Sequence, residues 1–459
     1  MTTYIGVDDT DSPDGMCTTY LLTEIIRELD FPVLLGYPRL VRLNPNIPWK
    51  TRGNGALSIA LSGNRGSAFK IGEISGREIL SSNEPSDHEE NADEMLERVS
   101  SVIERLAQFG EDNTNPGLVI SHNRPDSGFY WDAVRGVVNR DQAKNVLSRA
   151  GGTARTWKNG RGLIGATASI SWVPRGRSFE IIAYRERERW GTTRQLDASD
   201  VSGLSSRFPT TFSNYDESNR HTCIVPSSPC PVLFGIRGWD SSVLEEAMLS
   251  IRSEPRDRWL VFETNQGTDD HITVPQGMLE LFHSYMLNGT VSSAPVTIRG
   301  GHVFFDLETH QDRLACAAFE ETKELRKVVT RLIPGDRITV WGGLKPGPFG
   351  PCLNLEKLAV NALAVRRVKK ANPRCDVCGK PMQSAGKDSG YRCRKCHTKS
   401  GSAIYESVER QIQEGLYGVA ASSRRHISRP PEWSFSTSPG HSTELTNARQ
   451  ANTCQGNPI

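Results

Sequence analysis

Four aspartates crowd into a short stretch near the N-terminus, GVDDTDSPDGMCTTY at residues 6–20, and such a cluster could hold a metal ion. Asp8, Asp9 and Asp11 follow an apolar segment, residues 4–7, that predicts a strand, and the apolar spacing beyond the loop predicts a helix. Carboxylates and the free N–H groups of a helix N-terminus then share one loop. Mg²⁺ prefers oxygen ligands and commonly shares them with phosphate. The stretch therefore predicts a site for a nucleotide and Mg²⁺.

The hydroxyl of Thr18 or Thr19 would lie at the N-terminus of that helix, where it could accept or relay a phosphoryl group. We also expect Gly15 to contact the nucleotide. A purely structural interpretation stays open: Asp11 and Asp14 would be turn residues, Gly15 would supply a positive φ, and the threonine would be only an N-cap. A single aspartate would fit that interpretation, whereas the whole cluster favours a nucleotide site.

Two glycine-rich stretches carry positive charge and could contact phosphate: RLNPNIPWKTRGNGA at residues 42–56 and WKNGRGLIGA at residues 157–166. Their glycines would let the backbone approach a phosphate that the basic side chains neutralise. These side chains are Lys50, Arg52, Lys158 and Arg161. Hairpin turns with exposed basic residues would show the same pattern, so both interpretations stay open.

Other phosphate-binding loops are excluded by inspection. The sequence has no GxxxxGK[ST], which rules out the usual P-loop. GRGLIG at residues 160–165 matches GxGxxG, but the residues after it alternate as a strand would, whereas a dinucleotide-binding loop opens a helix. We therefore do not expect a dinucleotide fold.

Two CxxC pairs predict a zinc site. CDVC and CRKC are separated by fourteen residues, and two such knuckles can bring four thiolates into one tetrahedron. The predicted ligands are Cys375, Cys378, Cys393 and Cys396. His397 is expected to be a bystander. Basic residues flank the module, which favours contact with a phosphate backbone, although a solvated basic linker is the alternative.

The elements that must position these residues alternate between strands and helices. Over about 125 residues the predicted order is β, α, β, β, α, β, that of a ferredoxin-like or related α/β layer. A second α/β unit should end near residue 245, with a helix over residues 141–149 and strands over 166–172 and 179–184. From Asn288 five short strands follow, with a helix around residues 323–332 between the third and fourth, which is the OB-fold order.

Length and charge set the frame for these motifs. A chain of 459 residues is too long for one ordinary core. Its 55 Lys and Arg against 53 Asp and Glu give a net charge of +2, so a nucleic-acid surface must arise from local segregation of charge. No apolar run reaches the roughly 18 to 20 residues that span a bilayer, and the N-terminus does not look like a signal peptide. We expect a cytoplasmic protein.

The six cysteines outside the CxxC pairs show no framework spacing, which favours reduced thiols over disulfides. They are Cys17, Cys223, Cys230, Cys316, Cys352 and Cys454.

In this combination the motifs resemble those of the archaeal isoleucine-tRNA 2-agmatinylcytidine synthetase family. The resemblance covers most of residues 1–430. It is carried by GVDDTDSPDGMCTTY, LVRLNPNIPWKTRGNGA, KNGRGLIGA, FETNQGTDDH at residues 262–271, the OB-like strands, the CxxC pairs and SRRHISRP at residues 423–430. Several specific motifs in this order are hard to obtain by chance.

The resemblance implies an enzyme that uses ATP and Mg²⁺ to attach agmatine to C2 of the wobble cytidine in the CAU anticodon of isoleucine tRNA, so that the anticodon reads AUA instead of AUG. It implies cleavage of ATP to AMP and pyrophosphate, with phosphorylation of the cytidine O2 before the amine displaces it. By position, Asp8, Asp9 and Asp11 would bind Mg²⁺ and triphosphate, and Thr18 would be the family's phosphorylated threonine. The expected partners are this tRNA, agmatine and ATP, without a membrane or an obligatory protein partner.

The resemblance also names the parts of a multidomain α+β fold. These are an ATP-binding kinase-like α/β domain (1–125), a ferredoxin-like domain (126–245), an OB-fold (246–370, with a strand core at about 288–361), a zinc ribbon (371–400), a C-terminal basic segment (401–430) and a tail (431–459). The composition of the tail predicts disorder.

Three points stay open. Agmatine is a dication, so its guanidinium needs a carboxylate or carbonyl partner, and the candidates are Asp216, Glu217, Asp269 and Asp270. A non-catalytic binder of single-stranded nucleic acid, built from OB and zinc modules, is one alternative function. A DxD-type phosphotransferase of the haloacid-dehalogenase kind, with a phosphoaspartate at Asp9, is the other.

Overall fold

The computed structural model describes the chain except for residues 1, 62–65, 86–90, 348–349, 387–388 and 435–459. Two compact units make up the chain, one from residues 1–286, 341–351 and 418–459 and the other from residues 287–340 and 352–417. Most of the predicted tail, with Cys454, lies outside the described residues. Pro431–Trp433 at its start form the 3-10 helix η5.

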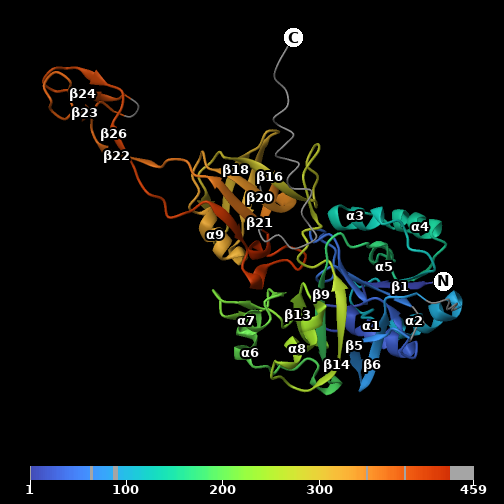
Figure 1. Cartoon of the computed structure of the whole chain (residues 1–459). Helices are drawn as coiled ribbons and strands as arrows, with labels where there is room; N and C mark the ends of the chain where they lie inside the picture. The colour runs from blue at the N-terminus through green and yellow to red at the C-terminus, as the bar shows by residue number, and fades with distance from the viewer. Residues whose placement is uncertain (1, 62–65, 86–90, 348–349, 387–388, 435–459) are drawn as a thin grey trace, which may run out of the picture. The chain divides into compact units, whose positions relative to one another are not determined.

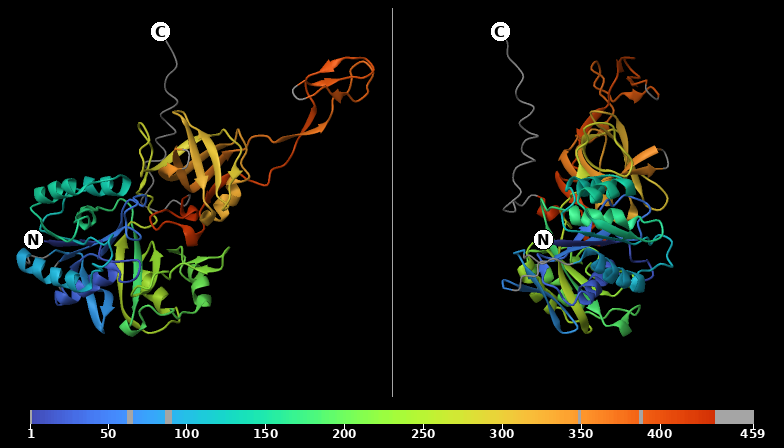
Figure 2. Two further views of the ribbon diagram at one scale, coloured as in Figure 1. Left: turned by 180° about the vertical axis from the view of Figure 1, so that it is seen from behind. Right: turned by 90° about the vertical axis from the view of Figure 1, so that its right-hand side faces the viewer.

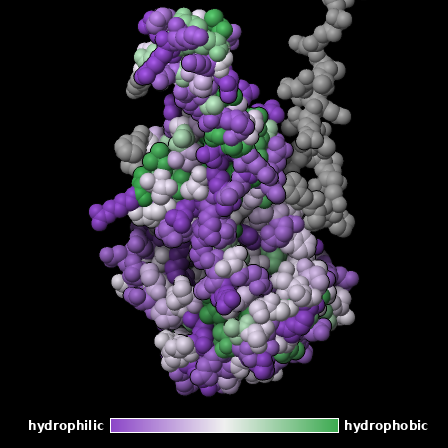
Figure 3. All heavy atoms as spheres, turned by 90° about the vertical axis from the view of Figure 1, so that its left-hand side faces the viewer, coloured by the Kyte–Doolittle hydropathy of each residue, from purple (hydrophilic) through white to green (hydrophobic). Residues whose placement is uncertain are grey.

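On the face shown in Figure 3, hydrophilic side chains predominate and apolar ones gather only in small groups. In the part of the chain that the structure describes, no helix is both long and apolar enough to cross a bilayer.

A twelve-stranded sheet organises the first unit (Figure 1). Its strands are β1 (Thr3–Asp8), β2 (Leu34–Leu35), β3 (Arg39–Arg42), β4 (Gly55–Leu61), β5 (Phe69–Ile74), β6 (Arg77–Ser82), β7 (Gly117–Ser121), β8 (Thr153–Thr156), β9 (Ser178–Arg185), β10 (Thr211–Phe212), β13 (Val232–Gly238) and β14 (Arg256–Thr264). The order is β10-β13-β9-β14-β5-β6-β2-β4-β1-β7-β8, with β3 beside β14 and β4. Strands from residues 3 to 264 therefore share one sheet.

Pairings within this sheet close a circuit. β14 pairs with β5 and β3, β5 with β6, β6 with β2, and β4 with both β2 and β3. The hairpin of β5 and β6 is missing from the predicted order, because each strand is six residues long and carries only two or three apolar side chains. The order predicted for the first 125 residues was therefore incomplete.

Helices cover both faces of the sheet around β1 (Figures 1 and 2). α1 (Thr18–Glu28) and α2 (Ala92–Leu106) share one apolar core with the strands. α3 (Gly128–Arg135), α4 (Arg140–Arg149) and α5 (Gly162–Ser171) form a second core with residues of β3, β4 and β7. The loop that leaves β1 is thus fixed between two packed layers.

The alternating pattern predicted a strand over Ala166–Trp172, but the structure has helix α5 there. Nine of the ten residues of α5 are buried, because it packs against β1, β4 and β7 on one side and α3 and α4 on the other. A helix buried on all sides carries no amphipathic period, so its small apolar residues alternate by chance. The expectation that GRGLIG does not open a helix was wrong for the same reason.

Shorter elements complete the first unit. Outside the large sheet, β11 (Tyr215–Asp216) pairs with β12 (His221–Thr222), and α8 (Leu244–Leu249) packs against β9 and β13. The others are η1 (Arg187–Arg189), α6 (Ala198–Ser202), α7 (Leu204–Arg207), η2 (Ser241–Val243), β15 (Ile272–Thr273) and η4 (Ala421–Ser423).

A closed circuit of five strands forms the core of the second unit. Its elements are β16 (Ser284–Val291), β18 (Val303–Glu308), β19 (Arg313–Ala318), η3 (Glu320–Thr322), α9 (Glu324–Val329), β20 (Arg337–Gly347) and β21 (Gly350–Ala362), with the short β17 (Val296–Thr297) beside β18. The circuit runs β16-β18-β19-β21-β20 and returns to β16. The three strands, helix and two strands predicted after residue 288 are present in that order.

Small ladders follow the five strands. β22 (Arg367–Ala371) pairs with β26 (Ile404–Ser407), and β23 (Gln383–Ser384), β24 (Tyr391–Arg392) and β25 (Lys399–Ser400) form a three-stranded sheet. Arg410 returns to the five-stranded core through a buried ion pair with Asp336, 2.5 Å between Nη1 and Oδ1. β27 (Gly415–Gly418) pairs with β21.

The contact between α5 and β7 should not tolerate a side chain. A Cβ added at Gly117 would lie 2.2 Å from the backbone carbon of Gly162. We expect Gly117→Ala to lower the free energy of unfolding by about 1–3 kcal/mol through overpacking, measured by urea denaturation. Gly110→Ala is the matched control, because no atom lies within 4 Å of a Cβ there. Equal stability of both variants would contradict this packing argument.

Candidate active site

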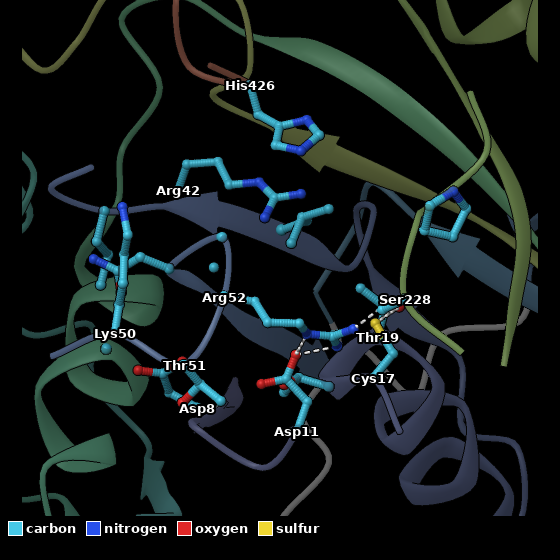
Figure 4. A pocket seen from close by; sticks show the side chains of 18 of the residues that line it. Asp8, Asp11, Cys17, Thr19, Arg42, Lys50, Thr51, Arg52, Ser228 and His426 are labelled. Carbon is cyan, nitrogen blue, oxygen red and sulfur yellow. Dashed lines mark hydrogen bonds and ion pairs between the residues drawn. The ribbon is translucent and has the colours of Figure 1, made fainter. Parts of the chain in front are cut away.

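A cavity of about 610 Å³ opens in the first unit where the acidic loop meets α1 and α5 (Figure 4). Asp8 ends β1, Asp9 and Asp11 follow it, and all three line the cavity. Asp9 adopts a φ of 59°, which is uncommon for a residue other than glycine. The loop therefore turns sharply and gathers its carboxylates on one wall.

The carboxylate of Asp8 lies against α5. A Cβ at Gly165 would lie 1.9 Å from Asp8 Oδ2, so only glycine permits this approach. Burial raises the pKa of Asp8 well above its usual value, and the neighbouring charge of Asp9 raises it further. The folded chain holds negative charge here at a free-energy cost, and a cation would relieve it.

Asp9 is held by donors from three segments. Thr51 Oγ1 donates to Asp9 Oδ1 at 2.8 Å, the Asn115 N–H donates to Oδ2 at 3.2 Å, and Arg161 Nη2 lies 3.7 Å from Oδ2. Burial still raises the pKa of Asp9, although these donors oppose the shift. Its carboxylate is thus fixed in orientation.

Arg52 is the partner of Asp11. Its Nε donates to Asp11 Oδ2 at 2.8 Å, and its Nη2 pairs with the same oxygen and donates to the Met16 carbonyl at 2.9 Å. Nη1 donates to Ser228 Oγ at 2.8 Å. Arg52 therefore ties the acidic loop to a distant segment, and Asp11 already balances its charge.

Thr18 lines the cavity at the first residue of α1. Its side chain is buried, and Thr10 Oγ1 donates to Thr18 Oγ1 at 3.1 Å. The N-cap of α1 is Cys17, without a side-chain cap bond, so the alternative that Thr18 or Thr19 is only an N-cap was wrong. The Thr18 oxygen accepts the bond from Thr10, so its own proton is free for another acceptor.

Two other predicted residues lie outside the cavity lining. Gly15 bridges to Ser12, and the positive φ of this bend, 57°, belongs to Met16. Lys158 donates to main-chain carbonyls, the closest being that of Glu111 at 2.6 Å, so it secures a loop. Lys50 does line the cavity, with its ammonium on the Pro45 carbonyl.

Several residues that line the cavity were not predicted from the sequence as part of a site. They are Arg42, Glu180, Arg237, Arg424 and His426. Arg42, Arg424 and His426 stand in stretches that carried the family resemblance, and their basic character was the signal available. Glu180 lies inside β9 and had no such signal.

The four acidic candidates for an agmatine partner do not line the cavity. Asp270 accepts from the Tyr130 hydroxyl at 2.6 Å, Asp269 accepts from the Arg429 N–H at 2.8 Å, and Asp216 accepts from Ser422 Oγ at 2.5 Å. Glu217 is exposed. Glu180 is the buried carboxylate that does line it.

The four cysteines of the CxxC pairs come together as one cluster, with their sulfur atoms all within 4.8 Å of one another. A tetrahedral zinc ion with bonds of about 2.3 Å separates sulfurs by about 3.8 Å, and Cys378 Sγ lies 3.6 Å from Cys393 Sγ. Each knuckle ends in a left-handed residue, Gly379 in one and His397 in the other. The donor set and its spacing fit zinc, and His397 stands outside the cluster.

Three stretches of the chain match models of known protein families. They are the TiaS TCKD domain at residues 4–158, the TiaS FLD domain at 160–271 and the TiaS C-terminal zinc ribbon domain at 372–412. A relative from Archaeoglobus fulgidus, the isoleucine-tRNA 2-agmatinylcytidine synthetase TiaS, is 39% identical over 440 residues, which cover 94% of this chain and 97% of the relative. The chain belongs to the TiaS family.

Two solved TiaS structures extend the similarity to the fold. The complex of TiaS with its isoleucine tRNA and ATP has a TM-score of 0.81 at 37% identity, covering 96% of this chain and 99% of that one. The complex of TiaS with the same tRNA, AMPCPP and agmatine has a TM-score of 0.79 at 35% identity and covers 96% and 99%. Within the TiaS matches, the acidic loop falls in the TCKD stretch, Glu180 and Arg237 fall in the FLD stretch, and the four cysteines fall in the zinc ribbon.

The raised pKa of Asp8 makes a prediction about stability in the absence of divalent cations. The folded chain binds the Asp8 proton more tightly than the unfolded chain, so stability falls as pH rises above about 4, the ordinary value for Asp. Asp8→Asn should raise Tm at pH 7.5 by about 1–2 °C, because roughly 1 kcal/mol shifts Tm by about 2–4 °C in a domain of 150–250 residues and by less in a larger unit. The gain should shrink as pH falls toward 5.

Differential scanning calorimetry across this pH range measures the effect. Asp14→Asn is the control, because Asp14 is exposed. A gain that does not depend on pH would show that the loop, rather than the buried charge, is responsible.

The cysteine cluster predicts one zinc ion per chain. Cys378→Ser should lower the zinc content of the purified protein by at least about half, because structural zinc needs its full set of thiolates. Cys223→Ser, outside the cluster, should leave it unchanged. Elemental analysis of both variants measures this, and equal zinc in the two would argue against the cluster as the site.

Proposed function

We propose that this chain is an ATP-dependent C–N ligase that attaches agmatine to C2 of the wobble cytidine in the CAU anticodon of an isoleucine tRNA, which converts reading of AUG into reading of AUA. The observation that carries this proposal is the similarity along nearly the whole chain to isoleucine-tRNA 2-agmatinylcytidine synthetases, including TiaS structures with that tRNA, ATP and agmatine. The cavity supports it, since about 610 Å³ lies in the usual range for small-molecule sites.

In this proposal Asp8, Asp9 and Asp11 hold Mg²⁺ and, through it, the triphosphate of ATP. Bound there, Mg²⁺ would supply positive charge that bridges carboxylate to phosphate. The raised pKa values of Asp8 and Asp9 support a cation site, because burial and, for Asp8, the neighbouring charge of Asp9 disfavour the charged carboxylates, which a cation would stabilise. Arg161, Lys50 and Arg52 also line the cavity and carry positive charge.

Thr18 is proposed as the threonine that takes a phosphoryl group. It lines the cavity as the first residue of α1, where free N–H groups favour phosphate. Thr10 donates to the Thr18 oxygen, so the Thr18 proton points elsewhere and is available for transfer.

The cytidine must leave its anticodon stack to react. Cytosine O2 is a poor leaving group, and phosphorylation makes its departure feasible when the amine attacks C2. A base can enter an enclosed cavity only after it has been drawn out of the stack. The cavity that the acidic loop lines would receive such a base beside the proposed ATP.

The proposed domains keep the order expected from the sequence: kinase-like, ferredoxin-like, OB-fold, zinc ribbon (371–400) and basic segment (401–430). The family matches over residues 4–158 and 160–271, and the place of β14 (Arg256–Thr264) in the sheet of the first unit, favour later boundaries for the first two domains than residues 125 and 245. The closed five-stranded circuit with α9 between its third and fourth strands supports the OB-fold assignment. The OB surface and ribbon would hold tRNA through base stacking and backbone contacts. A cytoplasmic location stays a prediction.

The two alternative functions fit less well. A non-catalytic binder built from the second unit leaves the cavity and its fixed carboxylates without a role. A DxD phosphotransferase would need Asp9 free to attack, whereas both of its oxygens are held by Thr51, Asn115 and Arg161.

Incorporation of labelled agmatine into a CAU isoleucine tRNA with ATP tests the proposal. Asp9→Ala and Thr18→Ala should each lower incorporation at least about 100-fold while tRNA affinity stays within about twofold, since both act on the phosphate site. Thr18→Ser keeps the hydroxyl and should retain activity, and Asp14→Asn should behave as wild type. Full activity of Thr18→Ala would remove Thr18 from the reaction.

A further inference from the structure

We propose that the end of the cavity formed by Arg42, Arg237, Arg424 and His426, here called the basic end, is a phosphate subsite separate from the acidic loop. The inference rests on the proposed function and deepens it. Figure 4 shows Arg42 and His426 on one side of the cavity and Asp11 with Arg52 on the other. The basic end is thus positioned to hold a second anionic group of the substrates.

Arg42 carries most of the argument. It ends β3 and lines the cavity, and its Nε is buried without a hydrogen-bond partner among the described residues. No described residue forms an ion pair with its guanidinium, and the charge of the nearby Glu180 offsets only part of its charge. A partly buried cation with an unused donor is costly, and an anionic ligand would complete the site.

The fold holds Arg42 in place. Asn265 holds the backbone of Arg42: its Oδ1 accepts from the backbone N–H at 2.7 Å, and its Nδ2 donates to the backbone carbonyl at 2.8 Å. A Cβ at Gly53 or Gly55 would lie 2.9 Å from Arg42 Nη1. These glycines therefore make room for an arginine of the chain itself, which explains part of the glycine-rich stretch that looked like a phosphate loop.

Positive charge prevails at the basic end. Arg237 forms an ion pair with Glu180, with 3.3 Å between Nε and Oε1. Glu180 Oε2 also accepts a hydrogen bond from Gln266 Nε2 at 2.6 Å. Arg424 has a buried Nε without a partner in the described chain, while its Nη1 donates to Ser213 Oγ at 2.9 Å and lies 3.6 Å from Oε1 of the exposed Glu432, and its Nη2 donates to the Val419 carbonyl at 3.3 Å. At the basic end, Glu180 offsets part of the positive charge, and Arg237 and Gln266 already engage its oxygens.

His426 experiences the same positive charge. It is exposed as a residue, and the chain crowded around its ring, with the charges of Arg237 and Arg42, lowers its pKa well below the usual value. A cationic group such as the ends of agmatine would be repelled here, whereas phosphate would find guanidinium donors of matching geometry.

Two phosphate sources come with the proposed reaction: the tRNA backbone beside the wobble nucleotide, and ATP. Asp11 already pairs with Arg52, so the charge of Arg52 is balanced within the acidic loop. The guanidinium groups of the basic end therefore add positive charge that the acidic loop does not supply. The two sources differ in one measurable way. Each backbone phosphate that a protein neutralises adds about 0.7 to the salt slope of single-strand binding.

Binding assays on Arg42→Gln and Arg42→Lys test the subsite. We measure the Kd of the CAU isoleucine tRNA without ATP at several salt concentrations, and the Kd of AMPCPP with Mg²⁺ without tRNA. We expect Arg42→Gln to raise one of these two Kd values about tenfold. Arg42→Lys should give an intermediate Kd, because lysine keeps the positive charge but loses the planar, bidentate donors of the guanidinium. Arg77→Gln is the control, because Arg77 pairs with Asp30 on an exposed part of β6.

A loss confined to tRNA, with a salt slope lower by about 0.7, identifies a backbone phosphate, and a loss confined to AMPCPP identifies a nucleotide phosphate. Either result supports the subsite. Unchanged binding in both assays overturns it, as does an equal loss in both with a lowered Tm, which would make Arg42 a structural residue. Lack of binding by the wild-type chain would instead refute the proposed function.

Discussion

Crowding of carboxylates at the end of β1 is the constraint on which the first unit depends. Asp8 and Asp9 lie where burial raises the pKa of both, and like charges that close together destabilise each other. The surrounding chain does not neutralise them fully. It fixes them instead, through Thr51, Asn115 and the close approach of α5 at Gly165. A site kept short of positive charge is ready for a cation, at some cost to stability.

The cavity separates its charges in space. Carboxylates gather at the acidic loop, where Arg52 pairs with Asp11, while guanidinium groups gather around Arg42 without an equal number of acids. Strands far apart in the chain build the second group, since Arg42 ends β3 and Arg237 lies on β13. In the proposed function, one cavity would hold a metal-bound nucleotide at one end and a further phosphate at the other.

The second unit is stabilised by a different principle in each of its parts. The five-stranded circuit buries an apolar core, and the buried pair of Asp336 with Arg410 fastens a later segment to it. Among its described residues the ribbon has only a small buried cluster, Cys375, Met382 and Cys393. So small a module needs its four thiolates on a metal to hold a fold.

Local pattern in the sequence determined the acidic loop after a strand, the helix that begins at Thr18 and the four-cysteine cluster, because spacing along the chain sets each of these. Tertiary structure alone decided that α5 is a helix, that Lys158 secures a loop, and that Arg42, Glu180 and His426 share a cavity. The reason is physical: a helix buried on every side shows no period, and neighbours hundreds of residues apart meet only through strand pairing and packing, which no short stretch of sequence encodes.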